Sequence, residues 1–370
     1  MKKNVLFYSA FMGYNNGAEM MLKYIILNIS KINPLLLSGD KGEMLKDIPP
    51  NIPFYILPTS KLGKWGNRFE RILKKFFNID IVNIHFKRII KKHSVDLIVI
   101  NSVFVDKIVP LLKNNNIPFI LYLHDLPLEY NFISIDDFKY IINNAKGFIG
   151  CSQLVCENLK IMGCKNVKLF YEGIDFAKIK TSEKIENEIK GMGYSYIFAM
   201  SGYFSERKGV HIIREIALYL KRYNAALVWM GLYPDNSYVY YIKKNIENLS
   251  IDNLIITGLL LDEEYYSWLN TCDAFLLTSM VDPYPLVMLE AAYLQKPIIA
   301  FNSGGVTEFV KEGMGKIVPY YCVNAYLDAI RDYIEGKIPI DKELLRKEAE
   351  RHDITKRIGE FEDILLSFIE

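Results

Sequence analysis

The chain is poor in cysteine and has no long apolar run, and each of these absences narrows what it can be. Its five cysteines are an odd number and form no C-x-x-C pair, so reduced thiols fit them better than disulfides or a zinc site. No apolar stretch is long enough to span a bilayer. These features predict a cytoplasmic protein. The cysteines are Cys151, Cys156, Cys164, Cys272 and Cys322.

Two further signals are missing near the starts of the predicted domains. The segment MKKNVLFYSAFMG has the charge and apolar run of a weak signal peptide, but Asn15, Asn16 and Glu19 follow at once, without a small-residue cleavage site. A first β-strand is therefore predicted there. No G-x-G-x-x-G follows the first strand of either domain, which argues against a dinucleotide-dependent oxidoreductase.

Length and charge indicate two unlike halves. A chain of 370 residues with 51% hydrophobic residues is ample for two packed cores. Residues 1–175 hold 23 Lys and Arg against 15 Asp and Glu, whereas residues 176–370 hold 22 against 28. The net charges are +8 and −6, so the first half is the one expected to meet anionic surfaces.

Apolar runs of strand type alternate with segments of helical spacing along the whole chain. This predicts two doubly wound, Rossmann-like α/β domains, over 1–175 and 195–352, with a polar linker at 176–194. The C-terminal helix, 353–370, is expected to pack back onto the first domain. The predicted strands are Val5–Ser9, Asp96–Ile100, Phe119–Leu123, Gly147–Cys151, Ser195–Met200, Ala226–Gly231, Leu254–Gly258, Ala274–Leu277 and Pro297–Phe301.

The stretch 278–310 has the clearest signs of a ligand site. A turn rich in proline, Asp282-Pro283-Tyr284-Pro285, separates a strand from a helix predicted over Leu286–Leu294. Such turns lie at the carboxyl ends of strands, where open α/β sheets bind their ligands. Asp282 and Glu290 are eight residues apart and lie on nearly the same face. Because Glu290 stands among apolar residues, we favour a functional role for it over a solvated surface acid.

Polar residues follow other strands in the same way. Gly17 begins a helix predicted to end at Ile29, and helix N-termini are natural anion sites. His124 and Asp125 directly follow the predicted apolar strand Phe119–Leu123. Arg207 and Lys208 stand at a helix N-terminus, where their charge is unfavourable unless an anion binds between them.

These motifs resemble the family 4 retaining glycosyltransferases, also called glycosyl transferases group 1, over nearly the whole chain. The resemblance rests on an acid, seven residues and Glu290, then KPIIA and a GG-x-x-E turn, and on a Lys-Gly loop at 201–209. It implies the GT-B fold, in which the two domains face each other across a cleft. The family usually has Glu where this chain has Asp282, and Arg where it has Tyr203.

The resemblance also implies roles for individual residues. Asp282 and His124 would flank the donor sugar, and Glu290 would bind the ribose. Lys208, assisted by Arg207, would hold the donor phosphates. Backbone groups of Gly17 and of the turn at Gly304 and Gly305 would approach the diphosphate, and the turn residues Tyr284, Pro285 and Leu286 are predicted to contact the donor as well.

The predicted function is transfer of a sugar, with retention, from a nucleoside diphosphate donor of the UDP or GDP type. The acceptor would be a glycan, lipid-linked or a cell-surface polysaccharide. No D-x-D triplet occurs, so no metal and no other cofactor are expected. The alternative is a catalytically weakened subunit of the same fold that binds or scaffolds without turnover, which would explain the changes at Tyr203 and Asp282 together. A nucleotide-sugar epimerase of the same fold is a further alternative.

The segment 60–93 has a different character, since basic residues alternate with aromatic ones. It would suit a helix lying on an anionic membrane, which would make the protein peripheral at the inner face of the membrane. Two ordinary amphipathic helices with solvated lysines explain it equally well. Nucleic-acid binding is not favoured, because no nucleic-acid motif accompanies it. Its basic residues are Lys61, Lys64, Arg68, Arg71, Lys74, Lys75, Lys87, Arg88, Lys91 and Lys92, and its large aromatic residues include Trp65, Phe69, Phe76 and Phe77.

Overall fold

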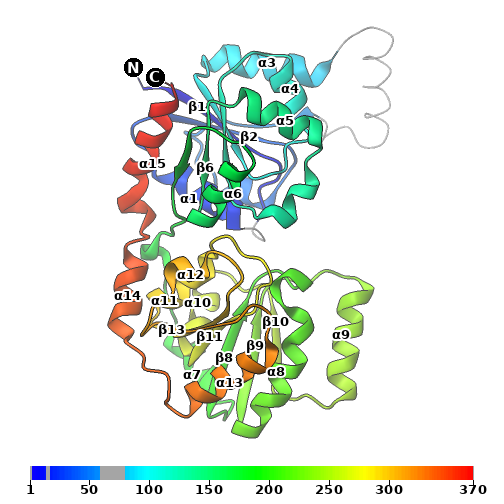
Figure 1. The fold of residues 1–370 in the computed structure, drawn as a ribbon, viewed down its shortest axis with the longest axis vertical. Helices are drawn as coiled ribbons and strands as arrows, with labels where there is room; N and C mark the ends of the chain where they lie inside the picture. Colours follow the sequence, from blue (N-terminus) through cyan, green and yellow to red (C-terminus); the bar gives the residue numbers. More distant parts are fainter. Residues whose placement is uncertain (1, 14–16, 59–79, 370) are drawn as a thin grey trace. The chain divides into compact units, whose positions relative to one another are not determined.

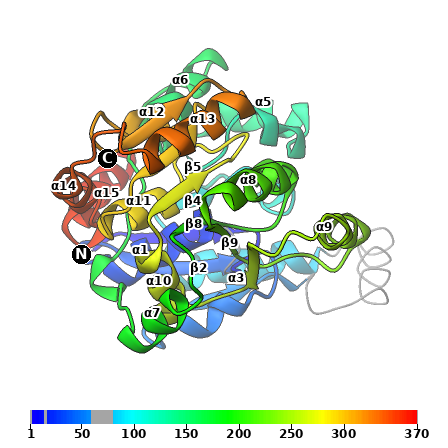
Figure 2. The ribbon, with the colours of Figure 1, turned by 90° about the horizontal axis from the view of Figure 1, so that it is seen from below.

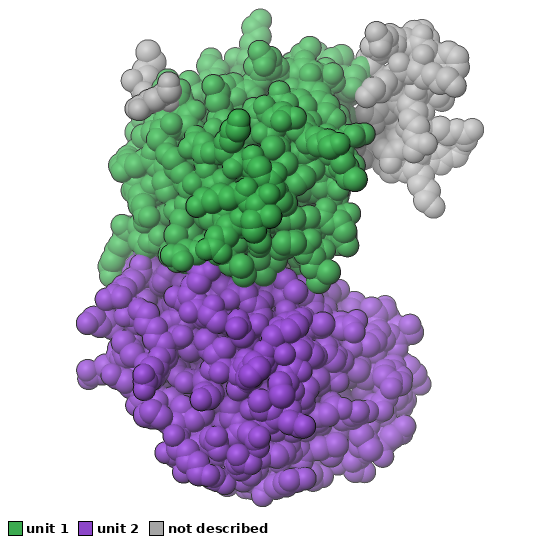
Figure 3. Space-filling model, viewed as in Figure 1, with its two compact units in different colours: residues 1–171, 354–370 green, residues 172–353 purple. Residues whose placement is uncertain are grey.

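The computed structural model describes all residues except 1, 14–16, 59–79 and 370. The chain divides into two compact units (Figure 3). The first unit holds residues 1–171 together with 354–370, and the second holds 172–353. Each unit contains one parallel sheet with helices packed against it, as the alternating sequence predicts.

The sheet of the first unit has seven strands in the order β3-β2-β1-β4-β5-β6-β7. Every neighbouring pair is parallel. The central strands are buried along their length, because helices cover both faces and leave no position for an alternating polar residue. The strands are β1 (Asn4–Ser9), β2 (Asn33–Ser38), β3 (Phe54–Ile56), β4 (Leu97–Asn101), β5 (Phe119–Leu123), β6 (Gly147–Gly150) and β7 (Val167–Leu169).

The C-terminal helix completes the core of the first unit and lies beside α1 (Figure 1). Its Phe361 packs against Phe170, with ring centroids 4.9 Å apart. The fully buried carboxylate of Glu362 accepts a hydrogen bond of 2.8 Å from the Ser30 N–H. The helices among the described residues of this unit are α1 (Gly17–Asn28), α3 (Ile81–His93), α4 (Val109–Lys113), α5 (Ile135–Asn144), α6 (Gln153–Ile161) and α15 (Ile354–Ile369), with 3-10 turns η1 (Glu43–Asp47) and η3 (Pro127–Phe132).

The sheet of the second unit has six parallel strands in the order β10-β9-β8-β11-β12-β13. Its core is built on Trp229, which is buried and meets the ring of Phe204 edge-on at 5.0 Å. The strands are β8 (Tyr196–Ser201), β9 (Ala225–Met230), β10 (Leu254–Gly258), β11 (Ala274–Leu277), β12 (Ile298–Phe301) and β13 (Gly315–Val318).

The helices of the second unit differ in how deeply they are buried. Helix α11 is largely buried. Helix α9 lies at the periphery beyond α8 (Figure 2), and its buried residue is Val239. The helices are α7 (Glu183–Lys190), α8 (Ile213–Leu220), α9 (Ser237–Asn248), α10 (Asp262–Thr271), α11 (Leu286–Tyr293), α12 (Val306–Phe309), α13 (Val323–Ile334) and α14 (Lys342–Glu350), with 3-10 turns η4 (Phe176–Lys178), η5 (Glu206–Lys208), η6 (Val210–Ile212) and η7 (Lys221–Tyr223).

The segment 176–194, predicted as a linker, is instead part of the second unit. It contains α7, which packs against α10 and whose Ile189 is buried. The Ser182 N–H donates to Ser267 Oγ at 2.8 Å, and Asn270 donates to Glu186 at 2.8 Å. The segment looked like a linker because a short surface helix buries one narrow stripe and leaves its other faces polar.

The basic, aromatic segment 60–93 lies mostly outside the described residues, so the prediction of a membrane surface is untested over 60–79. Its last part forms α3, whose apolar side chains Val82, Phe86 and Ile89 are buried in the first unit. This agrees with an ordinary amphipathic helix over that part. Within the described ranges, no helix combines the length and the apolar character needed to cross a membrane.

Candidate active site

Two loops of the second unit meet at the carboxyl ends of neighbouring strands and bring together two predicted residues. Lys208, after β8, donates from Nζ to Asp282 Oδ2, after β11, at 2.5 Å. Ser279 Oγ donates to the same carboxylate oxygen at 3.0 Å. Asp282 is buried and Lys208 is largely so. The predicted phosphate-binding lysine and the predicted sugar-side acid therefore form one charged cluster.

The loop that carries Lys208 is anchored to the core of the second unit. Phe204 points into the core against Trp229, and the Trp229 indole N–H donates to the Gly202 carbonyl at 3.1 Å. Gly209 closes the loop with φ of +85°, and a Cβ there would stand 2.5 Å from the carbonyl of Thr278. Because only glycine accepts both the angle and the contact, this residue holds the two loops together.

Arg207 belongs to the same cluster. Its guanidinium Nη1 donates to the Val281 carbonyl at 3.0 Å, and its own carbonyl accepts from the Met280 N–H at 2.7 Å. Tyr203, at the position where the resembled family has arginine, is 37% exposed. The charge of Arg207 also acts on Asp282, next to that of Lys208. The predicted contact of Arg207 with donor phosphates stays a prediction.

The charges around Asp282 determine its protonation. Burial raises its pKa, but the charges of Lys208 and Arg207 and the hydrogen bonds from Lys208 and Ser279 outweigh burial, so the pKa lies below its usual value. Asp282 is therefore ionised near neutral pH. The cluster carries two cations and one anion, and this net positive charge suits an anionic ligand.

Glu290 has partners of its own on α10. Tyr265 donates to its Oε2 at 2.9 Å, and Tyr266 donates to its Oε1 at 3.2 Å. Burial raises the pKa of Glu290, and the two tyrosine hydroxyls oppose this rise. The structure thus places Glu290 in a separate hydrogen-bonded group and not in the Lys208–Asp282 pair.

The turn around Gly304 and Gly305 is closed by backbone contacts with Asp282. The Gly305 N–H donates to the Asp282 carbonyl at 3.0 Å, so this N–H is engaged within the protein, contrary to the prediction that it is offered to a ligand. A Cβ at Gly305 would lie 1.9 Å from the Pro283 carbonyl oxygen, so close packing of two loops is the reason for glycine here. Gly304 lies in the left-handed half of backbone space, with φ of +147°.

The remaining turn residues, Tyr284, Pro285 and Leu286, have different structural roles. Tyr284 is buried, and its hydroxyl hydrogen-bonds His352 Nε2 at 3.2 Å while its ring meets Phe309 edge-on. Its side chain is therefore part of the packing of the second unit, and only its backbone is left for the predicted contact with a donor. Pro285 caps α11 and Leu286 begins it, as the sequence predicts.

The first unit has a second polar cluster, at the ends of β4 and β5. His124 is buried, with Nε2 at 2.9 Å from Asn101 Oδ1 and its ring centroid 4.0 Å from that of Tyr122. Asp125 is also buried, and its Oδ2 accepts from Ser102 Oγ at 2.9 Å. Desolvation, assisted by a hydrogen bond and the charge of Glu129, raises the pKa of Asp125 to about 7.

Helix α1 is joined to this cluster. Gly17 begins the helix, and the carbonyl of the next residue, Ala18, accepts from Asn101 Nδ2 at 3.2 Å. Residues 14–16, which lie in the predicted loop before Gly17, are outside the described residues. The predicted residues Gly17 and His124 thus belong to elements that Asn101 connects.

Sequence reasoning missed several of these residues. Asn101 ends the apolar strand β4 and Ser102 follows it; polar residues at a strand end are the signal that identified His124, and the same rule would have found them. Tyr265 and Tyr266 carry no such signal, because an aromatic pair on a helix is typical of ordinary packing. Only the fold brings them to Glu290.

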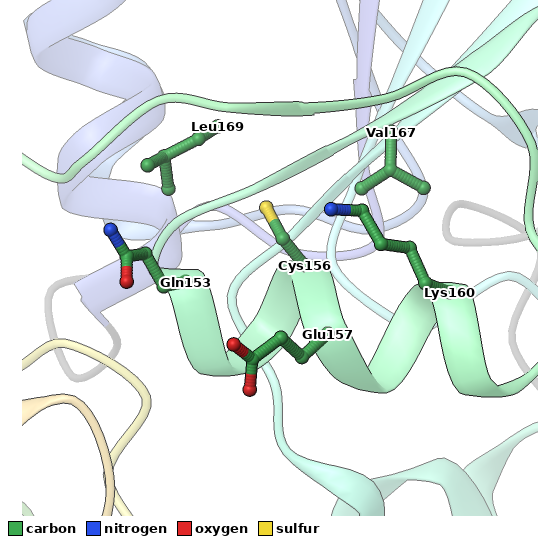
Figure 4. A pocket seen from close by; sticks show the side chains of 6 residues that line it. All are labelled: Gln153, Cys156, Glu157, Lys160, Val167 and Leu169. Atoms are coloured by element: carbon green, nitrogen blue, oxygen red, sulfur yellow. The ribbon is translucent and has the colours of Figure 1, made fainter.

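A pocket of about 260 Å³ lies elsewhere in the first unit, between α6 and β7 (Figure 4). It is lined by Cys156, Lys160 and Val167 among others, and it contains none of the predicted site residues. The polar clusters described above, and not this pocket, coincide with the sequence motifs.

Known proteins resemble this chain in sequence. Residues 182–352, all within the second unit, match the family model of glycosyl transferases group 1. A glycosyltransferase named for teichuronic acid biosynthesis, TuaC of Bacillus subtilis, is 22% identical over 312 residues, which cover 80% of this chain and 74% of TuaC. The O-antigen chain mannosyltransferase C of Escherichia coli is 23% identical over 211 residues, which cover 56% of this chain and 53% of the relative.

Solved structures extend the similarity of fold to nearly the whole chain. Anabaena HepE in complex with UDP and glucose superimposes with a TM-score of 0.79, at 20% identity and 99% coverage of both chains. WaaG, a glycosyltransferase involved in lipopolysaccharide biosynthesis, gives a TM-score of 0.73 at 14% identity, with 97% of this chain and 99% of WaaG covered. Both similarities concern the fold. The family match covers residues 182–352, and the solved structures show the fold of the chain, which has two Rossmann-like units of the GT-B type.

Proposed function

We propose that the protein is a retaining glycosyltransferase that moves a sugar from a nucleoside diphosphate donor to a glycan. The observation that carries this proposal is the buried Lys208–Asp282 pair, with Arg207 beside it, at the strand ends of the second unit. This unit is the part of the chain that matches the family model. A net cationic cluster in that place suits the diphosphate of such a donor.

The chemistry assigns a task to each charge. When the bond between the anomeric carbon and the diphosphate oxygen breaks, negative charge grows on the departing diphosphate. Lys208 and Arg207 stabilise this charge, and they are held in place beforehand, so little reorganisation is needed at the transition state. Asp282 orients Lys208 and lies beside the sugar. Its lowered pKa keeps it ionised, so it also stabilises positive charge that develops on the sugar ring.

Glu290 is proposed to bind the ribose of the donor. Each of its carboxylate oxygens accepts one tyrosine hydroxyl, and a carboxylate oxygen can accept a second donor such as a ribose hydroxyl. Tyr265 and Tyr266 therefore fix the orientation of the acid without using all of its acceptor capacity. The predicted roles of His124 beside the sugar and of Gly17 beside the diphosphate remain predictions.

The relatives support a choice of substrates. HepE was crystallised with UDP-glucose, TuaC is named for teichuronic acid biosynthesis, and the Escherichia coli relative is an O-antigen chain mannosyltransferase. We therefore propose a UDP or GDP sugar as donor and a growing surface polysaccharide, lipid-linked or free, as acceptor. The chain has no D-x-D motif, and we expect transfer without an added divalent metal.

The donor site is tested by calorimetric titration with a panel of nucleoside diphosphates and their sugars, in the absence of metal. One nucleotide should bind the wild type selectively, and Lys208→Ala should weaken its binding by roughly 100-fold or more, since a charge-assisted contact to phosphate is lost. Lys311→Ala is the matched control, because Lys311 pairs with Glu348 at 2.6 Å in the same unit. A control variant that lost binding equally would count against the assignment.

Turnover requires a second measurement. Retention is read from the anomeric configuration of the product by NMR, with polysaccharide fragments as acceptors. Selective nucleotide binding without turnover on any acceptor would favour the non-catalytic alternative. For a membrane-held acceptor, the protein should co-sediment with anionic vesicles at low salt and be released at high salt. Failure to co-sediment would contradict the proposed membrane-binding surface, and it would not affect the proposed donor site.

A further inference from the structure

Asn101 makes two hydrogen bonds that link separate elements of the first unit. It is the last residue of β4, and its side chain is almost completely buried. Its Nδ2 donates to the carbonyl of Ala18, in the first turn of α1, at 3.2 Å. Its Oδ1 lies 2.9 Å from Nε2 of His124, which follows β5. One amide therefore connects the start of a helix to the predicted sugar-side histidine.

The chemistry of the partners determines which way this amide points. A carbonyl oxygen can only accept a hydrogen bond, so the group that faces Ala18 must be the NH₂ of Asn101. The oxygen of Asn101 then faces His124, and an oxygen of this kind can only accept. His124 Nε2 must therefore carry the proton. In the neutral ring, Nδ1 is then the unprotonated nitrogen.

The surroundings leave the ring little freedom to change this arrangement. Tyr122 packs on His124 with ring centroids 4.0 Å apart. The next residues of both strand ends are joined as well, since Ser102 Oγ donates to Asp125 at 2.9 Å. Two hydrogen-bonded pairs therefore join the end of β4 to the end of β5, namely Asn101 with His124 and Ser102 with Asp125. The side chain of Asn101 also hydrogen-bonds α1.

We propose that Asn101 is a positioning residue for sugar transfer: it holds His124 as the Nε2–H tautomer and ties it to the first turn of α1. This inference rests on the proposed function, since its purpose is to present His124 correctly to a donor. A diphosphate that approaches the start of α1 would then act on His124 through one intervening side chain. Asn101 itself touches no reacting atom.

The tautomer is measured directly by ¹⁵N NMR of histidine-labelled protein. The chain has five histidines, and a His124→Gln variant identifies the resonances of His124. In the wild type, Nε2 should carry the proton. In Asn101→Ala, which removes both hydrogen bonds, His124 should shift to the other tautomer or to a mixture. Asn101→Asp keeps an acceptor toward His124 and loses the donor to Ala18, so Nε2 should keep its proton.

Kinetics then test the role in transfer. Asn101→Ala should lower kcat on the order of 100-fold, because a misoriented group at a reacting centre is costly, and should leave KM for the donor nearly unchanged. Asn101→Asp should recover part of kcat. Asn253→Ala is the matched control, since Asn253 is also buried and donates from Nδ2 to the carbonyls of Ala217 and Ala225, both at 2.8 Å. It should destabilise the second unit without changing the His124 spectrum.

Two results would overturn the proposal: a wild type with its proton on Nδ1, or an Asn101→Ala variant whose His124 spectrum and kcat match the wild type. A variant that fails to fold is recognised by its circular dichroism, and Asn101→Asp then carries the test. If the wild type transfers no sugar, the proposed function fails, and the spectra alone decide the link between Asn101 and His124.

Discussion

Two buried aspartates, one in each unit, show how differently the two polar clusters work. Asp125 and Asp282 are both 5% exposed, yet their pKa values move in opposite directions. Burial raises the pKa of both. At Asp125 a hydrogen bond and the charge of Glu129 add to this, and the pKa rises to about 7. At Asp282 the cations Lys208 and Arg207 outweigh burial and lower it.

Partners, and not depth, therefore decide the charge of each acid. The cluster of the second unit is charged and is suited to an anion. The cluster of the first unit is built from an amide, a hydroxyl, an imidazole and a carboxyl whose pKa is raised by burial. Such a cluster orients groups through hydrogen bonds more than it attracts charge. This difference matches the proposed tasks, namely stabilising a diphosphate in one unit and orienting a histidine in the other.

Removing the cation from Asp282 should have the largest effect on stability. Lys208→Met leaves a buried carboxylate without its ion-pair partner and should lower the free energy of unfolding of the second unit by about 3–5 kcal/mol. The double variant with Asp282→Asn should recover much of this loss, because no unpaired charge remains. Urea unfolding of both variants measures the two values.

The matched variant for this comparison is Lys311→Met. Lys311 forms an ion pair of similar length but is 51% exposed, compared with 15% for Lys208. Its loss should cost at most about 1 kcal/mol, since solvent screens such pairs. Equal costs for the two lysine variants would show that the burial of the Lys208–Asp282 pair has no energetic consequence.

Asp125 should make stability fall as the pH rises. Its folded pKa of about 7 lies above the value near 3.9 of an unfolded aspartate, so the folded protein holds the proton longer. Between pH 5 and pH 8 the wild type should lose roughly 3 kcal/mol relative to Asp125→Asn, which cannot ionise and still accepts the hydrogen bond from Ser102.

Asp137 provides a comparison, because its effect on stability should depend on pH with the opposite sign. Lys113 lowers the pKa of Asp137 through a hydrogen bond at 2.7 Å, so Asp137 favours the folded state above the unfolded pKa, and its contribution is lost as the pH falls. Asp137→Asn should therefore change the pH profile in the other direction. Thermal unfolding across a pH series that extends below the usual aspartate pKa of about 3.9 measures both profiles, and parallel profiles for the two variants would contradict the contrast.

The sequence predicted the alternation of strands and helices and the location of the main cluster. It did so because strand ends in a parallel sheet share one edge, so polar residues after apolar runs converge there. Asp282 and His124 were found by this rule, whereas Lys208 was found from its place at a predicted helix N-terminus and in the Lys-Gly loop. The membership of the C-terminal helix was also expected, and residues 354–370 belong to the first unit.

The parts that sequence did not predict are those that depend on specific hydrogen bonds. Spacing shows that Gly305 lies near a site, but not that its N–H is already donated to the Asp282 carbonyl. It places Tyr284 in the turn, but not its hydroxyl against His352. These outcomes depend on loop geometry between residues far apart in the chain, which no local pattern encodes. Helix α7 was not predicted for a related reason, because a polar helix with one buried stripe gives only a weak signal in the sequence.

A smaller effect is expected from the glycine that holds the two loops of the second unit together. Gly209→Ala should cost about 2–3 kcal/mol, because the new Cβ would meet the Thr278 carbonyl at 2.5 Å in a left-handed backbone conformation. Gly193→Ala has almost the same φ, +81°, and open space around it, so it should cost only about 1 kcal/mol. Equilibrium unfolding compares the two, and similar costs would mean that backbone angle alone requires glycine at Gly209.

The smallest effect should come from making Asp125 more like Asp282 through a single neighbour. Glu129 raises the pKa of Asp125 through a hydrogen bond and its charge, and Glu129→Gln replaces it with an amide that can donate to the ionised carboxylate. The pKa of Asp125 should fall by about 1, so the loss of stability between pH 5 and pH 8 should shrink by about 1 kcal/mol. Carboxyl ¹³C NMR of Asp125 measures the titration directly. A pKa that stayed near 7 in this variant would mean that burial alone sets it, and the contrast between the two aspartates would then rest entirely on the cations around Asp282.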